Sequence, residues 1–212
     1  MTPASQEALN ILRQTDNMQW SILFGLGLVI YAYVAEIEKK NWDAILMGLL
    51  FSSVEFLWEV ANALILHFTG YAPLWVTPAR TSFLIFSGIN IEIFLLFALA
   101  GVCLVKSLQA FEDEPDTKIL GIRYVYFIPL CWGLFCVFTE ALLNRAGLLI
   151  WTYKYWNFPH LWSVTINYMF PFFLCTWGHF KVSRPTKTRL LALFLVLDAA
   201  SWAVFVQMLK WI

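Results

Sequence analysis

The sequence predicts an all-α polytopic membrane protein in which six helices, or seven, surround a central cavity of polar and aromatic side chains. Of its 212 residues, 60% are hydrophobic and 13% are charged, and the mean hydropathy is +0.69. Such a composition is typical of membrane-spanning chains. A spanning helix takes ~20 apolar residues, so a chain of this length has room for several spans joined by short loops.

Six apolar segments are long enough to span a bilayer. They cover residues 18–37, 43–67, 81–107, 122–146, 160–180 and 188–211. Residues 1–17 form a polar N-terminal segment without the apolar core of a cleavable signal, so the first span is expected to direct insertion. We expect residues 18–212 to form one transmembrane domain. The aromatic stretch 145–158 is where a short re-entrant or interfacial seventh element would lie.

The basic residues predict the orientation. Nine lysines and arginines follow the first, third and fifth spans, and five lie on the other side. Because cytoplasmic loops carry the excess of positive charge, loops 38–42, 108–121 and 181–187 are predicted to be cytoplasmic. The protein is therefore expected to be an integral, multi-pass membrane protein that contacts lipid. Its formal net charge of zero gives no reason to expect a nucleic-acid partner.

The most informative residues are five acids inside the apolar segments, where no lysine or arginine faces them. They are Glu55, Glu59, Glu92, Glu140 and Asp198. A carboxylate near a bilayer centre costs several kcal/mol, so such residues usually face the bundle interior and mark function. We expect some of the five to be protonated at pH 7. Two acids of which one is protonated and the other ionised can act as an acid/base pair.

Helical spacing places these acids and other polar residues on one face of each helix. We expect the helices to pack with these polar faces towards the bundle interior. Glu55, Glu59 and Asn62 follow i, i+4, i+7 spacing on the second span. The polar and aromatic residues expected to bind substrate are Trp58, Asn62, Asn90, Glu92, Glu140, Asn144, Asn167, Tyr168 and Trp202. The position of the acids along their spans predicts a cavity that opens away from the basic loops. Buried Glu–Asn pairs can alternatively serve only as hydrogen bonds between helices.

Two non-cytoplasmic loops, residues 68–79 and 149–162, resemble each other. Each is aromatic, contains proline and follows a helix that carries Glu and Asn about one turn apart. The pairs are Glu59 with Asn62 and Glu140 with Asn144. This pattern favours a weak duplication of the second and third spans in the fourth and fifth, although aromatic residues at a membrane interface would also produce similar loops.

The sequence lacks the motifs of several common metal sites and enzyme active sites. The three histidines lie near helix ends, no Cys or His spacing is typical of a metal site, and no P-loop, GxSxG or HExxH motif is present. No helical aspartate cluster is available for Mg²⁺ and a diphosphate. The sequence therefore predicts neither a metal nor a cofactor.

Three short stretches carry a family resemblance. FLWEVANAL with Trp58 and Glu59, Ile-Asn-Ile around Asn90, and FLVLDAASWAVF with Asp198 resemble fungal integral-membrane terpene cyclases of meroterpenoid and indole-diterpene pathways. The resemblance implies that Glu59 and Asp198 form the acid/base pair, and Glu55 lies one turn from Glu59. The spaced residues Glu140, Asn144, Gly147, Trp151 and Tyr153 are similar to membrane carotenoid cyclases and hydratases.

The leading hypothesis is a cofactor-free isoprenoid cyclase or isomerase with Glu59, Asp198 and Glu55 as catalytic acids and a lipophilic substrate. A dry cavity protects carbocations from water, and aromatic faces stabilise them. One alternative is a proton- or cation-coupled transporter or channel, because a cluster of acids attracts cations. Another is a small scaffold subunit.

Overall fold

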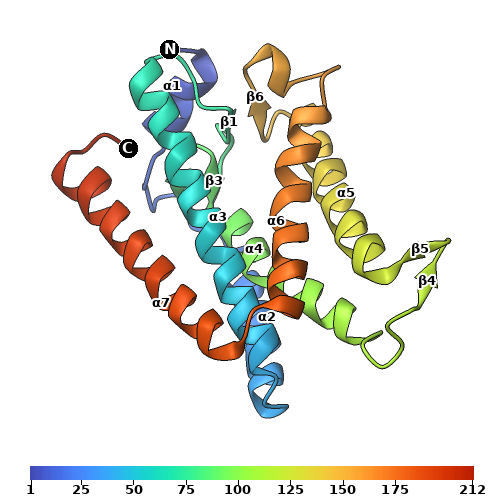
Figure 1. Ribbon diagram of the computed structural model, residues 1–212. Coiled ribbons are helices and arrows are strands. Elements are labelled where there is room, and N and C mark those ends of the chain that lie inside the picture. Colours follow the sequence, from blue (N-terminus) through green and yellow to red (C-terminus); the bar gives the residue numbers. More distant parts are fainter.

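The structure, a computed structural model, describes residues 1–212 and consists of six long helices and one short N-terminal helix (Figure 1). The helices are α1 (Pro3–Asn10), α2 (Ser21–Glu38), α3 (Trp42–Thr69), α4 (Ile91–Gln109), α5 (Tyr124–Arg145), α6 (Trp162–Lys181) and α7 (Arg184–Ser201). A π-helical segment, η2 (Trp202–Met208), continues α7. The length and composition of five helices, α2, α3, α4, α5 and α7 with η2, suit membrane spans. The predicted all-α membrane bundle is therefore confirmed.

Three short antiparallel strand pairs connect the helices. Strand β1 (Trp75–Val76) pairs with β6 (Ile150–Trp151), β2 (Leu84–Phe86) with β3 (Ile89–Asn90), and β4 (Lys118–Ile119) with β5 (Ile122–Arg123). The pair β4–β5 lies at one end of the bundle, and β1, β3, β6 and both termini lie at the other (Figure 1). Helix α1 packs against the second end, where Ala8, Val76 and Leu84 are buried together.

The third predicted span begins ten residues too early. The structure forms the hairpin β2–β3 before α4 and starts the helix only at Ile91. Asn90 is the N-cap, and its side chain accepts a hydrogen bond from the backbone N–H of Ile93 at 2.8 Å. A capping side chain of this kind ends the preceding extended segment and satisfies one free donor of the first helical turn. Apolar content alone does not distinguish a buried hairpin from the first turns of a helix.

The predicted seventh element is not a span, and α6 differs from the other long helices. Residues 145–158 contain β6 and a short 3-10 helix, η1 (Lys154–Trp156), both at the end of the bundle that holds the termini. Helix α6 is 20 residues long and lies alongside α5 (Figure 1). It lies outside the group of five apolar spans because Trp, Tyr, Asn and His lower its hydropathy.

The three loops that were predicted to share one side lie together at the end opposite the termini (Figure 1). Asp43 of α3 contacts both Lys187 of α7 and His179 of α6, and His179 Nε2 lies 2.6 Å from Glu112 Oε1 in the loop after α4. Lys187 is only 2% exposed. Removing one partner of a buried ion pair leaves an uncompensated charge, so this polar cluster ties four parts of the chain together.

Helices α3 and α4 approach each other closely at two glycines. A Cβ atom on Gly101 would lie 2.8 Å from the Gly48 Cα and 2.8 Å from the Phe51 Cβ. A Cβ on Gly48 would lie 2.5 Å from Val102 Cγ2. Small residues that let backbones come together are typical of helix contacts in membranes, where apolar burial gives little driving force. The glycine pair therefore determines the spacing of α3 and α4.

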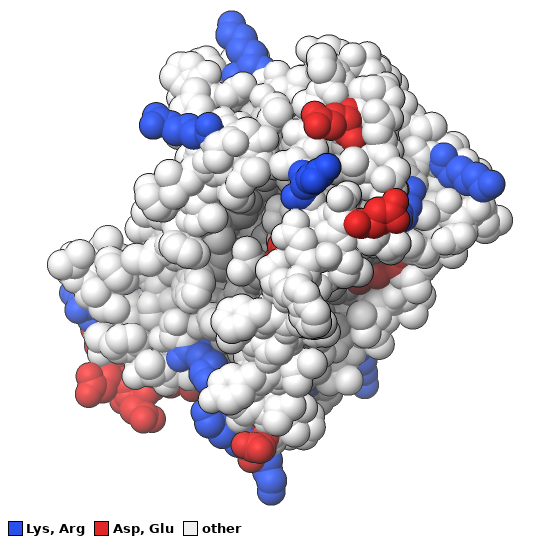
Figure 2. Space-filling model, turned by 180° about the vertical axis from the view of Figure 1, so that it is seen from behind, with Lys and Arg blue, Asp and Glu red and all other residues white.

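The long helices form two groups with a space between them. Helix α3 packs on α4, with α2 and α7 on the outside, and α5 packs on α6. The groups touch less extensively through α4–α5 and α3–α6. Figure 2 shows a hollow on the rear face, within a largely uncharged middle region. Most charged side chains on that face lie towards its ends.

Replacing Gly101 with leucine should weaken the α3–α4 contact. Overpacking at a tight position costs roughly 1–3 kcal/mol, so the midpoint of thermal unfolding in mild detergent should fall. Gly27→Leu is the matched control, because no atom lies within 4 Å of a Cβ built there. An equal loss of stability in both variants would contradict the assigned contact.

Candidate functional site

Three of the five acids share one cavity between the two helix groups. Glu55 and Glu59 of α3 and Glu140 of α5 are 8%, 3% and 5% exposed, respectively. They line a cavity of about 290 Å³, called here the acid chamber. The remaining walls are mostly apolar and aromatic, and they include Leu96, Phe97, Trp132, Phe135, Leu143 and Leu149. No lysine or arginine lines the chamber.

Glu59 is held by a tryptophan from β1. Trp75 Nε1 donates to Glu59 Oε1 at 3.0 Å, and Glu59 Oε2 is buried without a hydrogen-bond partner. Gly88, in the turn of the hairpin β2–β3, permits this arrangement, because a Cβ there would lie 2.7 Å from Glu59 Oε2 and 2.8 Å from Trp75 Nε1. Any larger residue at position 88 would displace the carboxyl group or the indole.

Glu140 has a similar environment. The side chains of Trp151, on β6, and Tyr168, on α6, lie beside its carboxyl group. Trp151 is 2% exposed, and its indole N–H is buried without a hydrogen-bond partner. An unpartnered donor therefore lies near Glu140, and an unpartnered acceptor lies on Glu59. Buried polar atoms of this kind are rare in folded proteins and call for a specific explanation.

The Glu59 and Glu140 environments are related by approximate two-fold symmetry. Trp75 and Trp151 stand opposite each other in the antiparallel pair β1–β6, as a two-fold axis between the strands would place them. Asn62 donates to the Trp75 carbonyl at 2.9 Å and accepts from the Leu74 N–H at 2.8 Å. Asn144 donates to the Leu149 carbonyl at 3.1 Å. Each half thus combines a Glu, an Asn that fixes the following segment, and a Trp, in agreement with the predicted duplication.

The pair β1–β6 covers the chamber at the end near the termini. Trp156 stacks on Trp75 with ring centroids 5.6 Å apart, and Tyr153 donates to the Ala72 carbonyl at 2.8 Å. The cavity was expected to open away from the basic loops. At that end the aromatic loops pair with each other over the chamber, and Tyr153, Tyr155 and Trp156 line the neighbouring cavity. Leu96 of α4 and Phe135 of α5, each 60% exposed, show that the chamber instead reaches the side of the bundle.

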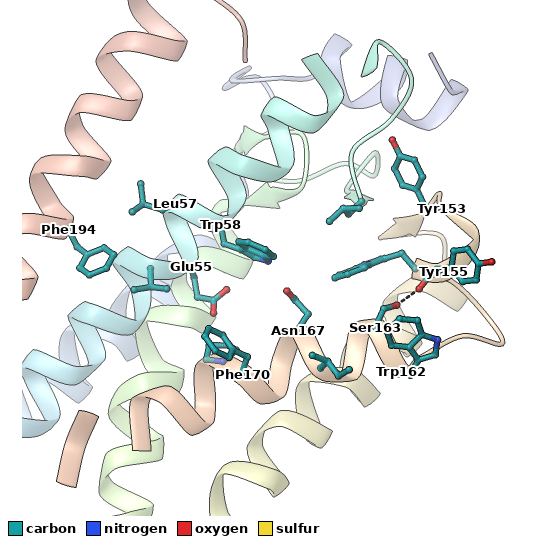
Figure 3. Close-up of a pocket in the computed structure, with 15 residues that line it drawn as sticks. Glu55, Leu57, Trp58, Tyr153, Tyr155, Trp162, Ser163, Asn167, Phe170 and Phe194 are labelled. Carbon is teal, nitrogen blue, oxygen red and sulfur yellow. Dashed lines mark hydrogen bonds between the residues drawn. The ribbon is translucent and has the colours of Figure 1, made fainter. Parts of the chain in front are cut away.

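A second cavity, the lateral groove, lies on the other side of Glu55. It has a volume of about 840 Å³ and is formed by α3, α6, one residue of α7, and the segment around η1. Figure 3 shows the Glu55 carboxyl group and the Asn167 side chain pointing into the space between α3 and α6. Glu55, Trp58 and Asn167 line both cavities. The sequence-predicted residues Trp58, Asn167 and Tyr168 thus gather with the three glutamates.

Asp198 does not join them. Its carboxyl group accepts a hydrogen bond from the Ser53 hydroxyl of α3, and the residue is half-buried between α3 and α7. It lines neither the acid chamber nor the lateral groove. The structure therefore does not bring Glu59 and Asp198 together, since Ser53 lies on a different side of α3 from the chamber-lining glutamates. Asp198 instead ties α7 to α3.

Five other predicted binding residues also lie outside the chamber, where they have structural contacts, and two of them are Asn62 and Asn144, which bind the segments after α3 and α5. Glu92 was expected near mid-span but lies in the first turn of α4, where its side chain accepts from the Ser82 N–H at 2.9 Å and from the Thr81 hydroxyl. Asn90 caps the same helix. Trp202 packs against Phe86, with centroids 5.7 Å apart. A carboxylate at a helix N-terminus is stabilised by the helix dipole and needs no catalytic role.

Trp75 and Gly88 are not among the site residues predicted from the sequence, and Trp151 was named only in the resemblance to carotenoid cyclases and hydratases, without a role beside Glu140. The available signal was the likeness of the two aromatic loops, each of which contains one of these tryptophans. Interfacial aromatic belts produce the same composition. From the sequence, the indoles of Trp75 and Trp151 could face either a carboxyl group or lipid headgroups. The pairing of β1 with β6 distinguishes the two cases.

Asn62→Leu should destabilise the cover of the chamber. It removes both hydrogen bonds to the β1 segment and leaves buried backbone groups unpaired, at roughly 1–3 kcal/mol for each. Asn167→Leu is the matched control, because Asn167 faces the cavities and makes no comparable backbone contact. In mild detergent, the midpoint of thermal unfolding should fall clearly for Asn62→Leu alone. Equal decreases for both variants would contradict the role of Asn62 in holding the β1 segment.

Comparison with known proteins identifies a family. A family model described as an uncharacterized membrane protein family matches residues 2–207. A protein of Archaeoglobus fulgidus, described as uncharacterized, is 36% identical over 212 residues, which cover all of this chain and 99% of the relative. No solved structure matches the chain. The chain therefore belongs to this uncharacterized family of membrane proteins and is an integral, multi-pass membrane protein.

Proposed function

We propose that the protein is a cofactor-free isoprenoid cyclase or isomerase that acts inside the membrane. The observation that carries this proposal is the convergence of three buried carboxyl groups in an aromatic chamber without any neighbouring cation. Three carboxylates in such a place repel one another and lose their hydration, so part of the set is neutral. A neutral carboxylic acid beside a carboxylate is the donor and acceptor pair that alkene isomerisation requires.

The surroundings of the glutamates favour Glu55 as the proton donor and Glu59 as the acceptor. Glu55 has no hydrogen-bond donor aimed at it, and a buried carboxyl group without a donor is most stable in its neutral form. Glu59 accepts from Trp75 Nε1, a contact that suits a carboxylate. Glu140 lies beside the donors Trp151 and Tyr168 and is the second candidate acceptor.

The proposed reaction conserves atoms and electrons. The O–H bond of the Glu55 acid breaks as the π electrons of a substrate alkene form a new C–H bond, which leaves a tertiary carbocation and a Glu55 carboxylate. In a cyclisation, a second alkene then attacks that cation. Loss of a proton from carbon to Glu59 regenerates an alkene, and proton exchange within the chamber restores the starting state. No oxidant, reductant or co-substrate is needed.

The walls of the chamber suit a cationic intermediate. The faces of Trp58, Trp132 and Tyr168 line it, and cation–π attraction is worth roughly 0.5–2 kcal/mol per ring. The cover formed by β1 and β6 separates the chamber from water at the nearer membrane surface. Excluding water prevents the cation from being quenched as an alcohol.

The proposal differs in one residue from the pair that the family resemblance implies. Asp198, bonded to Ser53, lies outside the chamber, whereas Glu55 lies inside it. Both residues are acidic and lie in apolar helices, so a comparison of their amides separates the two assignments.

Amide variants in D₂O provide the test. Purified protein is incubated with squalene, oxidosqualene and geranylgeraniol, and products that gain deuterium at carbon are counted by mass spectrometry. Because a general acid or base contributes roughly 10²–10⁴-fold to rate, Glu55→Gln and Glu59→Gln should each reduce deuterated product by at least about a hundredfold. Asp198→Asn, the matched control, should keep turnover within a few-fold of the parent protein.

Two results would overturn the proposal. One is undiminished turnover in the double variant Glu55→Gln/Glu59→Gln. The other is no deuterated product with any of the three isoprenoids, together with pH-driven ion flux in reconstituted vesicles that Glu55→Gln abolishes. The second result would identify a proton- or cation-coupled transporter instead.

A further inference from the structure

The path past the glutamates has two openings on different faces of the bundle. The lateral groove opens between α3 and α6, where Trp162, Ile166 and Phe170 are 57%, 60% and 68% exposed. The acid chamber reaches the surface between α4 and α5. Figure 1 shows α3 and α6 towards the viewer, and Figure 2, turned by 180°, shows the hollow on the opposite side. Exposed apolar side chains border both openings.

The two cavities meet at the catalytic glutamates of the proposed function. Glu55, Trp58 and Asn167 line both the lateral groove and the acid chamber. In Figure 3 the side chains of all three residues project into the space between α3 and α6. A chain that extends from the groove into the chamber would pass Glu55 first and then reach Glu59 and Glu140. The opening between α4 and α5 lies beyond them.

The approximate two-fold symmetry relates the two openings. If α3 corresponds to α5 and α4 to α6, as the paired Glu59/Trp75 and Glu140/Trp151 environments indicate, then the α3–α6 opening corresponds to the α5–α4 opening. A pocket for one end of a molecule needs a single mouth and a closed end. Two mouths that this symmetry relates, although their cavities differ in volume, suit a ligand that continues in both directions past the acids.

The linings also define the polarity of that ligand. Eleven of the 15 residues that line the groove are hydrophobic, and no lysine or arginine lines either cavity. Nothing in the path would bind a phosphate or diphosphate. Buried apolar surface contributes roughly 25 cal/mol per Å² to binding, so a long hydrocarbon gains along the whole path, and the only carboxyl groups that it meets are the three glutamates.

We propose that the substrate class is a linear isoprenoid hydrocarbon with similar halves, threaded through both openings, whose reacting alkene lies inside the chain rather than at one end. The inference rests on the proposed function only in that the acid chamber holds an isoprenoid. Squalene, which consists of two farnesyl halves, is the probe of this shape, and farnesene, with about half its length, is the short probe of the same chemistry.

The experiment narrows one opening at a time and measures binding without turnover. Ala100→Trp fills the side between α4 and α5, and Ile166→Trp fills the side between α3 and α6. Leu195→Trp is the matched control, because Leu195 is 51% exposed on α7 and lines neither cavity. Each protein is incubated with squalene or farnesene in mild detergent, and the ligand that remains bound after gel filtration is quantified by mass spectrometry.

Both tryptophan variants should bind squalene about tenfold more weakly, equivalent to about 1.4 kcal/mol, and should bind farnesene nearly as well as the parent protein through the open side. If only one variant binds less ligand, and the decrease is the same for squalene and for farnesene, the site is a pocket with one opening and the inference is overturned. Equal squalene binding by all variants would do the same. If Ala100→Trp lowers the thermal midpoint, Leu96→Trp at the same opening replaces it.

This readout is independent of catalysis. Squalene retention that depends on both openings, combined with unchanged turnover in Glu55→Gln/Glu59→Gln, would sustain the threaded site and reject the proposed acid chemistry. Conversely, loss of turnover in that double variant together with a one-ended binding pattern would support the acid chemistry and reject the threaded site.

Discussion

The placement of three carboxyl groups in a cation-free interior is the constraint on which the rest of the structure depends. Glu55, Glu59 and Glu140 are nearly fully buried, and charged groups in such surroundings cost several kcal/mol unless they are neutralised or hydrogen-bonded. The chain supplies indole and phenol groups rather than basic residues. Trp75 donates to Glu59, and Trp151 and Tyr168 lie beside Glu140. These groups bring hydrogen-bond donors close to two of the glutamates without adding a positive charge that would keep every glutamate ionised.

The architecture follows from the need to keep that interior open. Helices α3 and α4 are drawn together at Gly48 and Gly101, and α5 packs on α6, so each group is compact by itself. The two groups share one hydrophobic core, in which Phe51 of α3 packs against Phe172 of α6, and two further links lie at the ends of the bundle. Strands β1 and β6 join them at one end, and the polar cluster around Asp43 joins α3, α6 and α7 at the other. The chamber lies between this core and the pair β1–β6.

The sequence allowed prediction of the membrane class, six helices, the grouping of three loops at one end, and the convergence of the α3 glutamates with Glu140. These features depend on hydropathy, charge bias and helical periodicity, which are local. The start of α4 and the position of Asp198 could not be predicted in this way. Both depend on tertiary contacts: the hairpin before Asn90 replaces two helical turns, and Ser53 holds Asp198 on the far side of α3. The roles of Trp75 and Trp151 emerge only from strand pairing.

The central claim, that the chamber holds neutral and ionised carboxyl groups together, can be tested directly by infrared spectroscopy of the carboxyl C=O stretch at neutral pH. The parent protein should show a band of protonated carboxylic acid that shifts on exchange into D₂O, and Glu55→Gln should remove most of it, whereas Asp198→Asn should leave it in place. A parent spectrum without any protonated carboxyl band, or a band that persists when Glu55, Glu59 and Glu140 are all changed to glutamine, would contradict the account.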